Sequence, residues 1–391
     1  MRNGQAQKLL FSYAFRPFFL LLVLQAISMV LFWSLYWSNV LPFTWERNPI
    51  SWHGHEMLNG FVGAAIAGFL LTAVANWTSR PAVSGLPLIL LCSLWIGGRL
   101  ALASSFWAAV FDFAFWCLLL LIASNEILRA ANSRNYKILA ILAVLLVLDL
   151  GWHCAELWQP ALQGQFLWAQ LWVVVLLVTI IGGRVIPAFT GNWLRRQAAQ
   201  QNIQPTLNSM PVAFNYFDLI AIFALILFAF CTVFTVASSI TLAVGGIAAL
   251  LHAIRLVRWQ GHRTFSDPLV WMLHLSYAWI PIGIALMALA STGWISNSAG
   301  IHALTTGAIA GMIVSVSSRA ALGHTNRALI AHPLLTTCIL LLNLTAIFRV
   351  SASVLNLPFL INISALSWVT AFAFYGYVYV PILMGPPAKN C

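Results

Sequence analysis

Histidines near the ends of apolar segments are the residues of this sequence best suited to bind a cofactor. The densest pattern is Trp52-His53-Gly54-His55-Glu56-Met57, with two imidazoles and one carboxylate. Neutral imidazole is a ligand of haem iron, copper and zinc, and Glu56 or Trp52 would orient such a ligand. On a regular helix His53 and His55 point about 200° apart, so one ion binds both only if Gly54 makes the helix irregular. The alternative is two interfacial histidines that bond to backbone and water.

Four other histidines are candidate metal ligands. His302 faces a stripe of small residues that would admit a flat cofactor, and His153 is expected on the same side of the molecule. His274 and His324 are expected toward the other side, on neighbouring antiparallel helices. Because 22 residues separate His302 from His324, a straight helix would hold them about 33 Å apart. Each of the four also fits a structural role, as a buried hydrogen-bonded histidine or a helix cap.

The amino-acid composition indicates that the chain lies in a lipid environment. Of the 391 residues, 61% are hydrophobic and 7% are charged, whereas a soluble domain has roughly 25% charged residues. A chain this apolar must be surrounded by lipid. The net charge of +11 is spread along the chain, which argues against a nucleic-acid partner. The six cysteines form no CxxC or CxxCH motif, so neither a thiol redox pair nor covalent c-type haem attachment is indicated.

Apolar segments of membrane-spanning length recur along the whole chain. They fall roughly at residues 17–37, 53–76, 85–104, 106–129, 136–157, 161–187, 212–236, 238–258, 268–290, 298–317, 328–349 and 360–384. Turn-forming residues separate them. The sequence therefore predicts an all-α integral membrane protein, a bundle of about 12 transmembrane helices that forms one polytopic domain over residues 1–391.

Basic residues divide unequally between the two sides of such a bundle. With both termini on one side, that side holds Arg2, Lys8, Arg16, Arg80, Arg129, Arg134, Lys137, Arg184, Arg195, Arg196, Arg255, Arg258, Arg263, Arg319, Arg327 and Lys389. The other side holds only Arg47, Arg99 and Arg349. This excess of sixteen to three predicts that both termini are cytoplasmic.

A weak internal repeat relates the second and tenth segments. Each carries the pattern His-x4-Gly, as His55 with Gly60 and His302 with Gly307, and continues through small residues toward an arginine. Twelve helices can be arranged as three groups of four, in which case these two segments would be equivalent. The alternative is that small residues recur wherever membrane helices pack closely.

Several motifs together resemble the NnrS family. They are Phe15-Arg16-Pro17-Phe18-Phe19, Trp52-His53-Gly54-His55-Glu56-Met57, Gly68-Phe69-Leu70-Leu71-Thr72-Ala73-Val74, Asn76-Trp77-Thr78, Ser84-Gly85-Leu86-Pro87 and Arg319-Ala320-x2-Gly323-His324-Thr325. The likeness runs from about residue 11 to the C-terminus. It implies a haem- and copper-containing protein of the bacterial inner membrane, linked to nitric oxide metabolism and resistance. A weaker architectural likeness is to the twelve-helix core of haem–copper oxidases and nitric oxide reductases, whose histidine ligands on helices 6 and 7 this chain lacks.

The leading functional hypothesis is a b-type haem and copper protein that binds nitric oxide and detoxifies it or turns it over. The residues are compatible with an oxidoreductase served by an unidentified electron donor, and equally with nitric oxide being only bound. The alternative is a transporter or assembly factor for copper or haem, which Gly182-Gly183, Pro187 and Pro281 within apolar helices would allow. A third hypothesis is a haem-based sensor.

Specific residues carry the leading hypothesis. His55 and His302 are the expected axial ligands of haem. Their propionate partners would be Arg47, Arg99 and Arg349, the outward-facing cations. Copper is expected at His53 and His153 with one further donor, because a joint reaction needs neighbouring metals. The competing copper site consists of His274 and His324.

Overall fold

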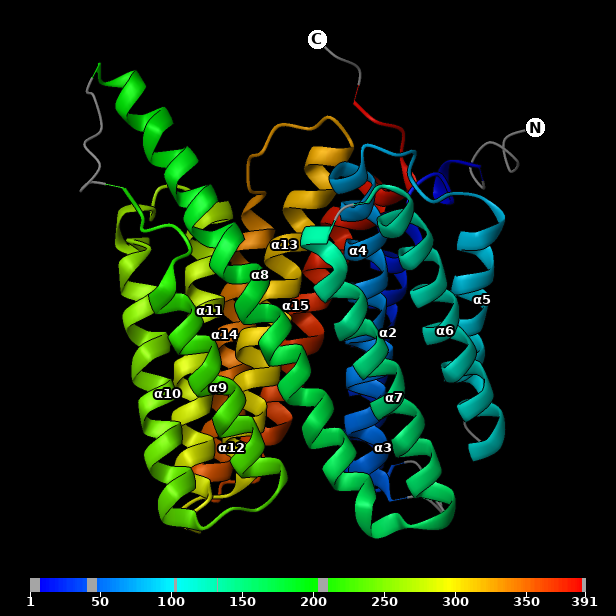
Figure 1. Ribbon diagram of the computed structural model, residues 1–391, viewed down its shortest axis with the longest axis vertical. Helices are drawn as coiled ribbons and strands as arrows, with labels where there is room; N and C mark the ends of the chain where they lie inside the picture. The colour runs from blue at the N-terminus through cyan, green and yellow to red at the C-terminus, as the bar shows by residue number, and fades with distance from the viewer. Residues whose placement is uncertain (1–7, 41–47, 102–103, 132, 203–209, 389–391) are drawn as a thin grey trace. The chain divides into compact units, whose positions relative to one another are not determined.

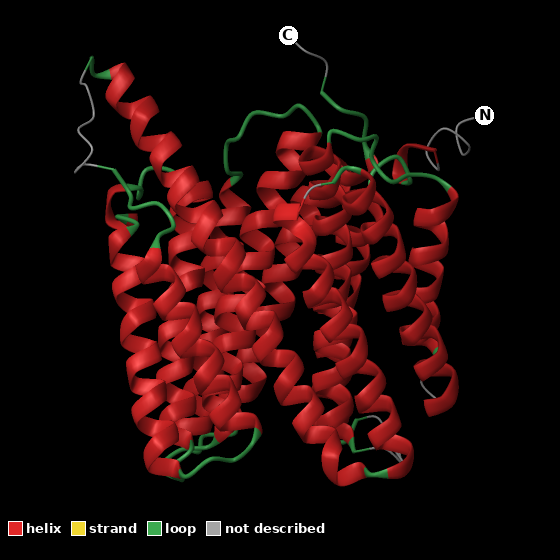
Figure 2. Cartoon of the chain, viewed as in Figure 1, coloured by secondary structure: helices red, strands yellow, loops and turns green. Residues whose placement is uncertain are grey.

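The chain is helical wherever its structure is described. The computed structural model describes residues 8–40, 48–101, 104–131, 133–202 and 210–388, and helices dominate these ranges (Figure 1, Figure 2). No strand occurs within them. The predicted all-α membrane fold is confirmed. Arg47, one of the predicted propionate partners, lies outside the described residues.

The observed helices follow the predicted segments closely. They are α2 (Phe15–Trp37), α3 (Pro49–His55) with η1 (Glu56–Val62) and α4 (Gly63–Thr78), α5 (Leu86–Leu100), α6 (Ser105–Arg129), α7 (Tyr136–Trp158), α8 (Gln163–Gln200), α9 (Tyr216–Val233), α10 (Ser238–Arg258), α11 (Pro268–Ala290), α12 (Asn297–His302) with η6 (Ala303–Ile309) and α13 (Ala310–His324), α14 (Pro333–Val354) and α15 (Phe359–Met384). Most predicted ends lie within five residues of the observed ones, and two C-terminal ends differ by more. The sixth helix continues beyond residue 187 to Gln200, with Pro187 inside it, and the tenth continues beyond residue 317 to His324.

The helix count follows from how the two ends of the chain meet. Among the described residues, eleven helices are long and apolar enough to cross a membrane, and α5 is a shorter apolar helix. Arg16, at the start of α2, donates from Nη1 to the carbonyls of Leu383 (2.6 Å) and Gly385 (2.8 Å), at the end of α15. The first and last helices therefore have neighbouring ends, which requires an even number of crossings. Counting α5 as a span gives the predicted twelve.

The helices assemble into two compact units. Unit 1 comprises residues 1–173, 317–328 and 375–391, and unit 2 comprises residues 174–316 and 329–374. In unit 1 the most enclosed span is Pro49–Thr78, where 83% of the most apolar stretch is buried, against 33% for Ser105–Arg129. Small residues explain this burial, because Gly68 lets Phe18 Cβ and the ring of Phe19 approach the helix backbone. This enclosed helix carries His55.

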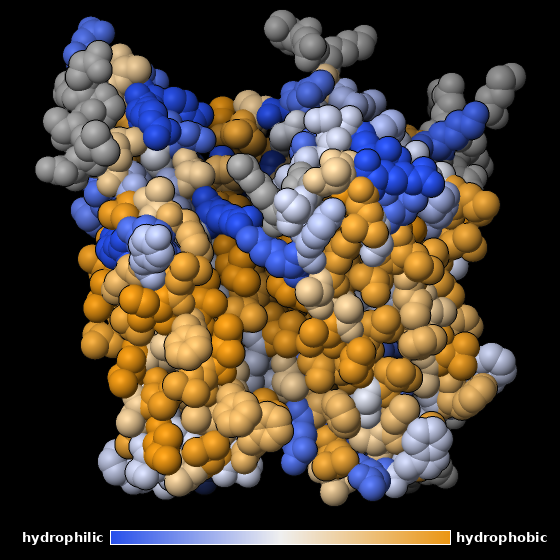
Figure 3. Space-filling model, in the orientation of Figure 1, coloured by the Kyte–Doolittle hydropathy of each residue, from blue (hydrophilic) through white to orange (hydrophobic). Residues whose placement is uncertain are grey.

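The outward faces of the other helices are apolar. Exposed side chains of α9 include Leu219, Ile220, Phe223, Ile226 and Phe230. On α6 they include Phe106, Trp107, Val110, Phe113 and Leu121. In Figure 3 hydrophobic side chains cover α9, α10, α5 and α6, and hydrophilic ones gather near helix ends. Apolar surface of this extent is stable in contact with lipid, as expected for a multi-pass membrane protein.

Candidate metal centre

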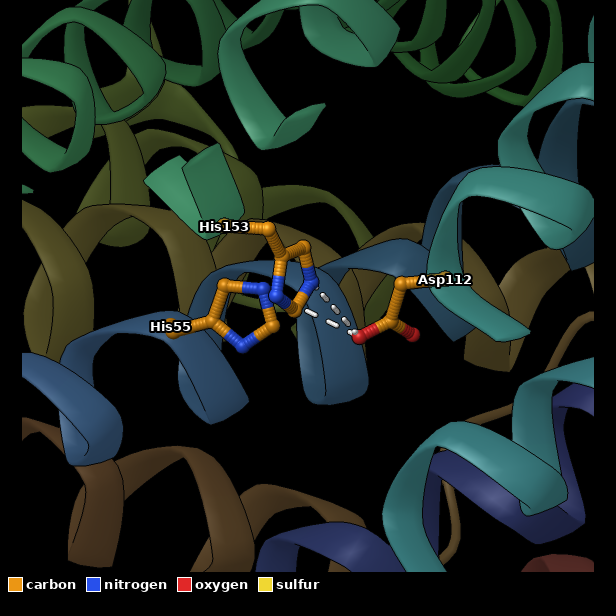
Figure 4. A group of neighbouring side chains, drawn as sticks. All are labelled: His55, Asp112 and His153. Carbon is orange, nitrogen blue, oxygen red and sulfur yellow. Dashed lines mark ion pairs between the residues drawn. The ribbon is translucent and has the colours of Figure 1, made fainter. Parts of the chain in front are cut away.

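Three buried side chains in unit 1 converge on a point within the membrane-spanning helices. They are His55, Asp112 and His153, whose potential ligand atoms all lie within 4.8 Å of one another. The Asp112 Oδ2 atom is 3.4 Å from His153 Nε2 and 3.9 Å from His55 Nε2. Figure 4 shows both imidazoles directed toward this carboxylate. The cluster is fully enclosed, with exposed fractions of 2% or less for each residue.

Each of the three residues comes from a different helix. His55 is the last residue of α3, which begins with Pro49 after the side chain of Asn48 has capped its first amides. Asp112 lies in α6 and His153 in α7. The His55 ring stacks on Trp152 at 3.9 Å between ring centroids, and this contact fixes its plane.

Further charged groups surround the cluster. Asp149, one turn before His153 on α7, places Oδ1 within hydrogen-bonding distance of His55 Nε2, at 2.9 Å. Arg99 forms an ion pair with Glu56, with 2.7 Å between Nε and Oε2, and its Nη2 donates to both oxygens of Asp112 at 2.8 Å. Three carboxyl groups therefore face one guanidinium and two imidazoles. A metal binds the deprotonated forms of these ligands, and in those forms the formal charge of the site without a metal would be −2.

This geometry fits a transition-metal ion. A metal about 2.0–2.2 Å from each nitrogen or oxygen ligand holds those atoms roughly 3–4 Å apart, the separations seen around Asp112. Two imidazoles and one carboxylate are ligands for copper, zinc or iron(II). The negative excess would be balanced by a divalent cation. In their deprotonated forms, the carboxylates would repel one another without an ion, in a medium where unbalanced charge is costly.

The motif around His53 separates into two environments. His53 stacks on Trp33, with ring centroids 4.3 Å apart, whereas His55 points into the cluster. The helix is regular up to His55, so the expected 200° divergence applies and the two histidines do not share a site. Trp52 is buried against Phe32, and Glu56 lies beside His55, with 3.6 Å between Oε1 and Nδ1.

The remaining predicted residues lie elsewhere. His274 belongs to unit 2 and bonds through Nε2 to the hydroxyl of Thr190 at 2.8 Å. His324 belongs to unit 1, where its ring stacks on Phe15 at 5.5 Å. Arg99, predicted to face a propionate, is engaged by Glu56 and Asp112.

His302 and Arg349 lie together in unit 2. His302 Nδ1 bonds to the Ser298 carbonyl at 2.8 Å, and the Ser298 hydroxyl is 3.2 Å from the Ser353 hydroxyl. Arg349 Nη1 donates to that Ser353 hydroxyl at 2.7 Å. Because a carbonyl only accepts, Nδ1 of His302 carries the proton and Nε2 carries the lone pair that binds metals.

Neither Asp112 nor Asp149 was predicted as a ligand from the sequence. Both carry a recognisable signal. Asp112 interrupts the apolar run Ala-Ala-Val-Phe-Asp-Phe-Ala-Phe-Trp, and a carboxylate at membrane depth is usually functional. Asp149 precedes His153 by four residues, which places both on one helix face.

The fold and the cluster together define a polytopic helical membrane protein with a buried histidine–carboxylate centre. The family model described as "NnrS protein" matches residues 9–386. The chain belongs to the NnrS family, as its motifs predicted. A comparison with curated proteins gave no match. Family membership supports a membrane protein associated with nitric oxide.

Proposed function

We propose that this protein binds and detoxifies or turns over nitric oxide by means of haem and a copper ion held by His55, Asp112 and His153. The observation that carries the proposal is the convergence of these three buried side chains in a chain of the NnrS family. Copper accepts imidazole nitrogen in both of its common oxidation states. Bound haem would supply an iron that binds nitric oxide, and copper would accept an electron.

The protein's own residues have defined tasks in this proposal. His55 and His153 provide nitrogen ligands, and Asp112 provides an anionic oxygen. Asp149, whose Oδ1 lies 2.9 Å from the same Nε2 atom of His55, joins the ligand set, and Glu56 lies 3.6 Å from the other ring nitrogen, Nδ1. Arg99 pairs with Glu56 and Asp112 and so offsets part of the negative charge of the centre. The surrounding apolar helices exclude water and admit small uncharged molecules such as nitric oxide from the membrane.

The transport alternative has less support. A transporter is expected to have discontinuous helices near its substrate. The prolines that suggested such breaks, Pro187 and Pro281, lie inside the continuous helices α8 and α11. His55 also lies in the most enclosed span of unit 1, and the side chains of all three ligands are buried. These features favour a resident metal over a cargo.

The metal site is tested on purified protein. We expect about one copper ion per chain in the wild-type protein, and loss of most of it in His55→Ala and His153→Ala. His53→Ala is the matched control, since His53 lies two residues from His55 but outside the cluster. Metal analysis with copper, iron and zinc measured together also identifies the ion. Equal metal content in all four proteins would refute the site.

Nitric oxide handling is tested separately. Membranes that contain the protein and an added reductant should remove dissolved nitric oxide faster than membranes without it, as followed with an electrode. The optical spectrum should show a Soret band that shifts when nitric oxide binds. If the purified protein has metal but neither binds nor removes nitric oxide, the metal site stands and the proposed function fails.

A further inference from the structure

Two membrane-spanning helices, one that carries His55 and one that carries His302, have the same local backbone structure. In unit 1, α3 ends at His55 and the seven-residue π-helix η1 follows. In unit 2, α12 ends at His302 and the seven-residue π-helix η6 follows. A π-helix is rare and is frequently found at functional sites. The shared design indicates that His302 has the same place in unit 2 as His55 has in unit 1.

The charges available to the two histidines differ. Unit 2 contains only two acidic residues in its sequence, Asp218 and Asp267. The turn that precedes His302 packs against Met287, near the end of α11, whereas Asp267 caps the start of that helix about 30 Å away. Asp218 is linked through one arginine to Tyr277, about 15 Å along α11 from Met287. Within unit 2, therefore, the carboxylates that make the His55 site suitable for a bare cation have no counterpart beside His302.

A cation takes their place in unit 2. Arg349 connects to His302 through two hydroxyl groups. Arg349 donates to the Ser353 hydroxyl, which contacts the Ser298 hydroxyl, and the latter lies 3.2 Å from His302 Nδ1. All four side chains are partly exposed, so a ligand can approach them. The site offers one metal-binding imidazole, fixed in its tautomer, beside one guanidinium. This pairing suits a metal that arrives already chelated by a ligand with negatively charged groups.

We infer that unit 2 holds the haem, with His302 as an axial ligand and Arg349 as the partner of a propionate, while the histidine–carboxylate cluster of unit 1 holds a bare metal ion. The inference rests on the proposed function, because it assigns one of the two expected cofactors to each unit. It also explains why Arg99 and Arg349, both expected to contact haem, have different surroundings. Arg99 neutralises carboxylates, whereas Arg349 donates to a neutral hydroxyl.

The test compares haem binding in full-length variants by optical spectroscopy and the pyridine haemochrome method. His302→Ala should lose the wild-type Soret spectrum, and added imidazole should restore a six-coordinate spectrum by replacing the missing ligand. Arg349→Leu should bind haem about tenfold more weakly, because a charge-assisted hydrogen bond is lost, and Arg349→Lys should recover part of the affinity. The matched control is His274→Ala, a unit 2 histidine bonded to Thr190.

Metal content at the unit 1 cluster reports whether each variant is folded. A wild-type spectrum in His302→Ala would overturn this inference and leave the proposed function intact. Loss of haem from His302→Ala that imidazole does not restore, in protein that keeps its unit 1 metal, would also overturn it. A wild-type protein without haem would overturn both.

Discussion

At the scale of single residues, the candidate site combines a histidine motif that is evident in the sequence with two acids, Asp112 and Asp149. The sequence does not show that these acids lie beside the motif. The divergence of His53 and His55 follows from helix geometry and could be predicted. The side chains that meet His55 could not be predicted, because the convergence of α3, α6 and α7 depends on packing between helices distant in sequence. Asp112 is 57 residues from His55, and no local pattern connects them. A carboxylate in an apolar segment indicates that a partner exists without identifying it.

Asp112 is predicted to matter for both stability and metal binding. Asp112→Asn removes the charge that pairs with Arg99 and the oxygen nearest to His153. We expect metal content to fall strongly and the free energy of unfolding to fall by about 3 kcal/mol, because a buried guanidinium loses a partner. Both are measured on detergent-solubilised protein, by metal analysis and by thermal unfolding.

Glu126→Gln is the matched control for that substitution. Glu126 also pairs with an arginine, Arg80, but the arginine side chain is 33% exposed and the pair belongs to the opposite end of α6 from Asp112. Water solvates the partner that remains, so little change in unfolding temperature and none in metal content is expected. If Asp112→Asn behaves like Glu126→Gln, the cluster is neither a metal site nor a buried charge network.

At the scale of helices, the positions of the membrane-spanning helices could be predicted from the sequence, but their local departures from α-helical geometry could not. Hydropathy located all twelve segments, since lipid contact imposes a simple requirement on length and composition. It did not reveal the π-helices η1 and η6, whose hydrogen bonds depend on the helices packed around them. The His-x4-Gly pattern marked both places, however, because the glycine falls inside each π-helix. The predicted internal relation between these two helices is therefore visible in their backbone as well.

Close packing of α8 against a buried arginine leads to a second prediction. Arg255 is fully buried and donates to Asp218 (2.5 Å), the Thr179 carbonyl (3.0 Å) and the Tyr277 hydroxyl (2.9 Å). A methyl group on Gly183 would overlap this guanidinium. Gly183→Ala should therefore lower the free energy of unfolding by about 1–3 kcal/mol, measured by thermal unfolding, because Arg255 must leave its partners or α8 must shift.

A second helical glycine provides the comparison. Gly246, within α10, has no atom within 4 Å of the place where a methyl group would be added. Gly246→Ala should be neutral or slightly stabilising, since alanine favours a helix more than glycine does. If both substitutions destabilise the protein equally, then glycine-to-alanine changes in these helices are destabilising in general. That result would contradict the specific role assigned to Gly183.

At the scale of the whole molecule, the direction of the chain in the membrane is a prediction from its charges. The ends of the first and last helices meet at Arg16, which supports an even number of spans. The excess of basic residues on the side of both termini predicts that this side is the cytoplasm. Reporter domains fused after residue 389 and within residues 39–49 should report opposite sides of the membrane. Reports from the same side would contradict the count of twelve.

The bond between Arg16 and the carbonyls of Leu383 and Gly385 also has a consequence for biosynthesis. Arg16 is synthesised 367 residues before its acceptor Leu383 and 369 residues before Gly385. The contact between α2 and α15 therefore forms only after every helix between them has been made. Unit 1, assembled from three separate stretches of chain, becomes complete only once the stretch from residue 375 has been inserted. A metal bound at its centre before then would be held by a partly assembled bundle, so metal binding is expected to follow insertion of α15.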